Sequence, residues 1–90
     1  MKFIGKYELE VRDEQTIDAV EGFKPLSVDM QYDRLMVWGT MRDDSPPQRR
    51  RFYIRGTGHP LGAADGATFV GTVLAAGGSL IWHVFDGGPA

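Results

Sequence analysis

The sequence lacks cysteine altogether, which excludes both a disulfide framework and a cysteine-ligated zinc site. It also lacks a long hydrophobic run, because the longest near-apolar stretch, residues 67–76, is too short to span a bilayer and contains threonine and glycine. The first residues have no apolar segment of the kind that signal peptides carry. We therefore expect a soluble, cytoplasmic protein that has no contact with the membrane.

The composition is that of one small folded domain, residues 1–90. The hydrophobic fraction is 42% and the charged fraction 24%, both typical of globular domains. The net charge is only −2, but ten of the twelve acidic residues lie in residues 1–44. An acidic N-terminal half favours a basic protein partner over nucleic acid.

No stretch repeats apolar residues at helical spacing, whereas several short runs alternate apolar and polar residues or are rich in β-branched and aromatic residues. These runs predict six or seven strands, at residues 3–11, 16–20, 26–32, 35–41, 50–55, 67–75 and 79–85. Residues 13–20 are the one segment that could instead form a short helical turn. The fold class that follows is all-β, an antiparallel sandwich or a small open barrel.

Glycine and proline mark the connections between these strands. Asp33 and Arg34 predict a tight hairpin turn, and residues 76–78, with two glycines, predict a second one. The Pro-rich residues 42–48 and the Gly-rich residues 56–66 are expected to be loops.

His59 lies in the segment Thr57-Gly58-His59-Pro60, where an imidazole between glycines could act as an acid or base. The favoured interpretation is structural: Gly56 and Gly58 supply positive φ angles for a turn, and His59 caps a backbone group. A catalytic role would need a partner carboxylate or nucleophile, and the sequence indicates none. We therefore expect no catalytic residues, no cofactor and no enzymatic activity.

The only other histidine is His83, and its spacing from His59, Asp65 and Asp86 matches no metal-binding motif. No metal site is expected. If Trp82 and Val84 face the core, then His83 faces outward with its alternating neighbours.

One strand carries a cluster of basic residues that could bind nucleic acid with an aromatic platform. Alternation places four of them on one face: Arg49, Arg51, Tyr53 and Arg55. The favoured alternative is a solvated strand face, with Glu8 and Glu10 opposite the arginines on a neighbouring strand.

Acidic residues of the N-terminal half are the candidate partner-binding residues. They would form a charge mimic of nucleic acid if they shared one face, and would merely solvate the sheets if they did not. The set comprises Glu8, Glu10, Asp13, Glu14, Asp29, Asp43 and Asp44.

Two strands are apolar on both faces, because Met36 and Trp38, and likewise Ile81 and Phe85, alternate with other apolar residues. Such strands are either central in a sandwich or present an apolar surface to a partner.

Several segments resemble a family of small proteins of unknown function encoded by tailed phages and prophages. The resemblance covers nearly the whole chain, and its most specific parts are Gly56-Thr57-Gly58-His59-Pro60 and Trp82-His83-Val84-Phe85. The other parts are residues 6–11, 13–17, 26–28, 35–38, 69–73 and 80–81. It carries over no catalytic residues.

The resemblance implies a context rather than a chemistry. Small phage proteins without catalytic signatures are often accessory factors that bind a host protein. We therefore expect a binding protein that inhibits a host defence complex in the host cytoplasm, and most sharply an anti-CRISPR inhibitor of a CRISPR–Cas effector. The alternative is a small nucleic-acid-binding or virion-associated protein that uses the arginine strand. The sequence fixes no oligomeric state.

Overall fold

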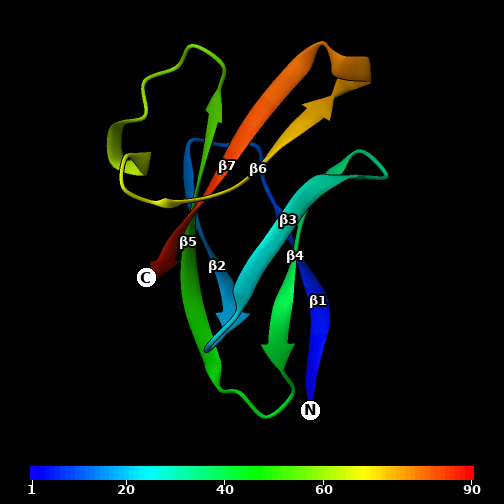
Figure 1. Ribbon diagram of the computed structural model, residues 1–90, viewed down its shortest axis with the longest axis vertical. Coiled ribbons are helices and arrows are strands. Elements are labelled where there is room, and N and C mark those ends of the chain that lie inside the picture. The colour runs from blue at the N-terminus through cyan, green and yellow to red at the C-terminus, as the bar shows by residue number, and fades with distance from the viewer.

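A computed structural model describes residues 1–90 and confirms the all-β fold. Seven strands form two antiparallel sheets that pack as a sandwich, as Figure 1 shows. The strands are β1 (Lys2–Leu9), β2 (Glu14–Val20), β3 (Lys24–Gln31), β4 (Arg34–Arg42), β5 (Pro47–Gly56), β6 (Thr68–Ala75) and β7 (Leu80–Pro89). The only helical segments are two single turns, η1 (Gly62–Ala64) and η2 (Ala76–Gly78), so the N-terminal helical turn considered for residues 13–20 is replaced by β2.

The chain passes repeatedly between the two sheets. The smaller sheet has the order β1-β4-β3 and the larger one the order β2-β5-β7-β6. Only the β3–β4 and β6–β7 connections are hairpins within one sheet, as expected from the two predicted turns. The central strands β4 and β7 are the two that are apolar on both faces, which confirms the first of the two explanations for that pattern.

The β3–β4 turn lies one residue earlier than the sequence indicates. Its central residues are Tyr32 and Asp33, with φ angles of 50° and 63°, and Arg34 already belongs to β4, opposite Gln31. Positive φ at both central residues is the geometry of a type I′ turn, which matches the twist of the flanking strands. Asp tolerates this conformation better than most residues, so the turn forms without glycine.

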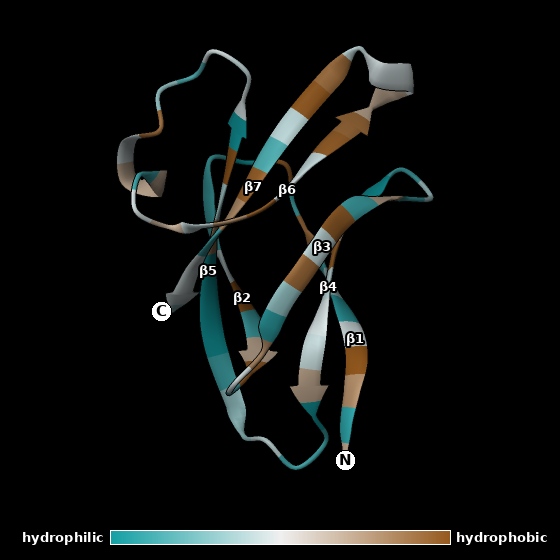
Figure 2. Ribbon diagram, viewed as in Figure 1, coloured by the Kyte–Doolittle hydropathy of each residue, from teal (hydrophilic) through white to brown (hydrophobic).

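The core lies between the sheets and is formed by alternate residues of the central strands. Phe52, Val37, Val73 and Val84 are all at most 1% exposed. Figure 2 shows the corresponding alternation of hydrophobic and hydrophilic residues along β3. Phe23, from the turn between β2 and β3, is equally buried and packs edge-on against Tyr7, with 4.9 Å between ring centroids.

The start of β7 departs from the expected burial. Val84 is fully buried as predicted, but Trp82 is only half-buried and Leu80 is 47% exposed, although both alternate with core positions. Beyond Val84 the β1–β2 turn lies opposite Trp82 in place of a facing strand, because Val11, Arg12 and Asp13 line a hollow together with it. The end of the sandwich is therefore left open.

None of the helical segments is long and apolar enough to cross a membrane.

Candidate functional site

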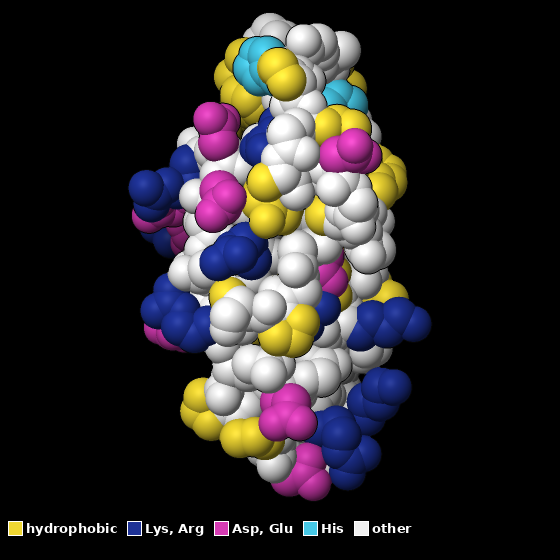
Figure 3. All heavy atoms as spheres, turned by 90° about the vertical axis from the view of Figure 1, so that its left-hand side faces the viewer, with side chains coloured by type: hydrophobic (Ala, Val, Ile, Leu, Met, Phe, Trp, Pro, Cys, Tyr) yellow, Lys and Arg dark blue, Asp and Glu magenta, His cyan; other side chains and the backbone are white.

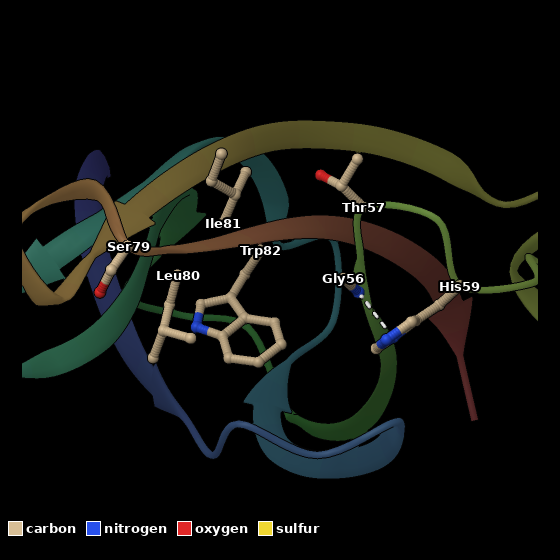
Figure 4. Close-up of a pocket in the computed structure, with 7 residues that line it drawn as sticks. All are labelled: Gly56, Thr57, His59, Ser79, Leu80, Ile81 and Trp82. Atoms are coloured by element: carbon tan, nitrogen blue, oxygen red, sulfur yellow. Dashed lines mark hydrogen bonds between the residues drawn. The ribbon is translucent and has the colours of Figure 1, made fainter.

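The largest hollow in the molecule opens at this end of the sandwich and has a volume of about 410 Å³. The end of β5, the loop after it and the start of β7 supply its walls. Figure 4 shows the lining residues, which are Gly56, Thr57, His59, Ser79, Leu80, Ile81 and Trp82. The side chains of Leu80 and Trp82 lie side by side on one wall, and His59 lies across from them. We call this hollow the His59–Trp82 pocket.

A tight turn fixes the position of His59. The His59 amide donates a hydrogen bond to the Gly56 carbonyl (3.1 Å), and Gly58 has a φ of 88°, as the third residue of a type II turn requires. The Gly56 amide donates in return to Nδ1 of His59 (3.2 Å; dashed line in Figure 4). The predicted capping role of His59 and the positive φ at Gly58 are thus confirmed, whereas Gly56 does not have a positive φ.

Gly56 is needed for a different reason. A Cβ atom at this position would lie 2.8 Å from Cε1 of His59, so the imidazole packs directly on the glycine backbone. Any larger residue would push the ring out of place.

Arg55 holds the loop against the rest of the molecule. Its Nε donates to the carbonyls of Pro60 (3.1 Å) and Leu61 (3.0 Å), and its Nη1 donates to the carbonyl of Asp13 (2.6 Å). The guanidinium therefore ties the Gly-rich loop to the β1–β2 turn, and both segments border the open end of the sandwich.

A second hollow of about 180 Å³ adjoins the first, and the two share Gly56, His59 and Trp82 as lining residues. Its remaining wall comes from the β1–β2 turn, including Arg12 and Asp13. The imidazole and the indole therefore stand where the two hollows meet, with an apolar wall on one side and a charged rim on the other.

The polar groups around the pocket suit binding better than catalysis. Nδ1 of His59 accepts a backbone hydrogen bond, which places the proton of the neutral imidazole on Nε2, where it can donate to a ligand. No carboxylate or hydroxyl is hydrogen-bonded to His59. The Thr57 hydroxyl instead meets Nε2 of His83 (2.8 Å), whose Nδ1 meets the Thr72 hydroxyl (3.0 Å).

The structure contains no group of three or more histidine, aspartate or glutamate residues that could hold a metal ion. His83 lies on the outer face of the larger sheet between its two threonines.

The arginine strand, β5, is bonded within the molecule. Arg49 lies 3.5 Å from Asp18, Arg51 lies 3.7 Å from Glu14, and both acids belong to β2. Tyr53 is only 8% exposed, and the Arg55 guanidinium lies 5.6 Å from its ring centroid. The predicted aromatic platform is therefore wrong, because Tyr53 offers no open ring face for a base.

The expected pairing of the arginines with Glu8 and Glu10 is also wrong. Strand β1 belongs to the other sheet, where Glu8 bonds Arg34 (3.0 Å), while Glu10 bonds Arg12 (3.1 Å). Sequence alternation gave the correct face of β5 but could not identify its neighbouring strands.

The seven acidic residues do not form one continuous face. Glu8 and Asp29 flank Met36 on the outer side of the smaller sheet, whereas Glu14 lies on the larger sheet. Asp43 and Asp44 lie at one end of β4, and Glu10 and Asp13 near its other end. Five of the seven have a cationic partner within 4 Å, the exceptions being Asp13 and Asp29.

Sequence reasoning missed the pocket. It singled out His59 and Trp82 separately, but treated Trp82 as core and gave Leu80 no role beyond an inward-facing strand position. Figure 3 shows hydrophobic side chains and both histidines gathered at the upper end of the molecule, while Lys, Arg, Asp and Glu side chains cover the face below.

A comparison with protein families places this chain. One family, described as Domain of unknown function (DUF7352), matches residues 1–90. The chain belongs to this family. No curated protein and no solved structure is significantly similar to this DUF7352 domain. The family description assigns no activity, so the function has to be inferred from the site itself.

Proposed function

We propose that this protein is a non-enzymatic binding protein and that the His59–Trp82 pocket receives a side chain of its protein partner. The observation that carries the proposal is the exposure of Leu80 and Trp82 in a hollow, although both alternate with core residues. Partly exposed aromatic and aliphatic side chains in a concave site are typical of the centres of protein interfaces.

The pocket also defines the chemistry of the side chain that it would take. An aromatic or branched aliphatic group would pack against the indole of Trp82 and the side chain of Leu80. Nε2–H of His59 would donate to a carbonyl or hydroxyl of the same partner segment. Arg12 and Asp13, in the adjoining hollow, would contact polar groups at the rim.

The sharper form of the proposal is that the partner is a host defence complex, with a CRISPR–Cas effector as the most specific candidate and the host cytoplasm as the place of action. This form is supported by the resemblance to small phage-encoded proteins. The alternative is nucleic-acid binding by Arg49, Arg51 and Arg55. A gel shift that weakens steeply with added salt would favour that alternative.

The experiment is a plaque assay of a targeted phage on CRISPR-active hosts, with and without this protein expressed. Two matched variants locate the contact: Leu80→Asp in the pocket, and Leu26→Asp on β3 of the other sheet. These leucines are 47% and 48% exposed, so both substitutions change the fold equally little. We expect wild type and Leu26→Asp to rescue the phage and Leu80→Asp to fail.

The outcomes separate the two parts of the proposal. No rescue by wild type across several CRISPR types would remove the inhibitor form. Rescue by Leu80→Asp as strong as by wild type would show that the pocket makes no contact with the partner.

A further inference from the structure

Strand β6 is an edge of the larger sheet with an unpaired backbone side. It pairs with β7 alone, and no other element exchanges a backbone hydrogen bond with it. Strand β3 lies close to it across the two layers, where Gly71 faces Val28, but this contact is made by packing. The outward amides and carbonyls of β6 are therefore open to another strand.

The other three edge strands carry the features that discourage such pairing. Strand β1 contains two lysines and a glutamate, β2 contains Glu14 and Asp18, and β3 contains Lys24, Pro25, Asp29 and a bulge. Strand β6, with the sequence TFVGTVLA, has neither a charged residue nor a proline. Natural sheets use charge, proline and bulges to prevent association at their edges, so β6 is the one edge left open to pairing.

We infer that β6 pairs antiparallel with β6 of a second copy of this chain and joins the two larger sheets into one. The strand is its own complement. With the two-fold axis at Thr72, the threonines of the two copies face each other and Leu74 of one copy lies opposite Val70 of the other. The absence of charge means that no like charges meet across the axis.

The outer face of the sheet supports a second copy as the occupant. Phe69 and Leu74 on β6 are 55% and 61% exposed, and they lie beside Phe85 and Ile81 of β7. The rings of Phe69 and Phe85 pack edge to face, with their centroids 5.5 Å apart. In the dimer this apolar strip continues across the seam, so that Leu74 gains an apolar neighbour from the partner.

Sedimentation velocity over a concentration series tests the inference. The chain has a mass of 10.0 kDa, so we expect a transition from 10 kDa to 20 kDa as the concentration rises. Leu74→Lys places a charge beside its symmetry mate at the seam and should leave a monomer where wild type is dimeric. Ile4→Lys is the matched control, because Ile4 is 65% exposed on the edge strand β1, and it should dimerise normally.

Hydrogen exchange keeps the inference testable if Leu74→Lys does not fold. The amides of β6 in the wild-type protein should exchange more slowly at high concentration than at low, while those of β1 should not change. A wild type that stays monomeric, a Leu74→Lys variant that still dimerises, assembly beyond the dimer, or equal effects of the two lysines would each overturn the inference. The seam involves neither His59 nor Leu80, so this result is independent of the proposed pocket.

Discussion

The guanidinium of Arg50 on β5 and the carboxylate of Asp86 on β7 form a two-pronged ion pair that is nearly buried. Nε donates to Oδ1 (2.9 Å) and Nη2 to Oδ2 (2.6 Å), and the side chains are only 13% and 10% exposed. The Gly88 amide donates a further hydrogen bond to Oδ1 (2.8 Å). The pair therefore links the two central strands of the larger sheet near the end of β7.

Removing one partner of this pair should be costly. Asp86→Ala leaves the Arg50 guanidinium nearly buried without a counter-charge, and we expect a loss of about 3 kcal/mol in the free energy of unfolding, measured with urea. The double variant Arg50→Met/Asp86→Leu should recover most of that loss, because it removes both charges. The exposed pair Arg42–Asp44 is the control, and Asp44→Ala should cost less than about 0.5 kcal/mol. Equal losses for the two alanine variants would contradict this account.

Burial along β7 should decide the cost of truncation at alternate positions. Val84 is fully buried, so Val84→Ala should lower the free energy of unfolding by about 2 kcal/mol. Leu80 has the same alternation but is 47% exposed, so Leu80→Ala should cost less than about 0.5 kcal/mol. If Leu80→Ala is as damaging as Val84→Ala, the pocket is closed in solution.

The pair Arg42–Asp44 predicts a local pH dependence. Hydrogen bonds and attraction from Arg42 hold the pKa of the Asp44 carboxyl below its usual value of 3.8. A pKa that is lower in the folded state means that the pairing stabilises the fold above the ordinary pKa of aspartate. That contribution disappears as the pH falls through the lowered value. NMR titration of the Asp44 carboxyl should show its pKa rising toward the usual value in Arg42→Gln, and an unchanged pKa would show that the two groups do not pair in solution.

Loss of the imidazole should loosen the turn that borders the pocket. In His59→Ala the Gly56 amide has no acceptor from the loop, so its hydrogen exchange should accelerate, while amides in the centre of β5 should not change. The matched variant His59→Asn has a carbonyl oxygen that can accept the same bond, and it should exchange more slowly than His59→Ala. Equal exchange rates in wild type and His59→Ala would show that Nδ1 does not hold the turn.

The sequence alone determined the strands and most of their connections. Alternation of apolar and polar residues follows from the backbone geometry of a strand, so a local pattern is sufficient to locate β1, β3, β4 and β5. Glycine and proline act locally as well, which is why the turn at Gly58 and the loop after Gly56 could be foreseen. The β3–β4 turn was misplaced by one residue because Tyr32 has no sequence preference for positive φ.

Only the tertiary structure decided which strands are neighbours and where the facing sheet ends. The arginines of β5 meet Asp18 and Glu14 because β2 crosses to the larger sheet, and no local pattern encodes that crossing. Leu80 and Val84 follow the same alternation, yet one is exposed and the other buried, because burial depends on what lies opposite. The pocket and the open edge of β6 arise at places where the chain supplies no such neighbour, and this absence is a property of the packed sheets rather than of any segment.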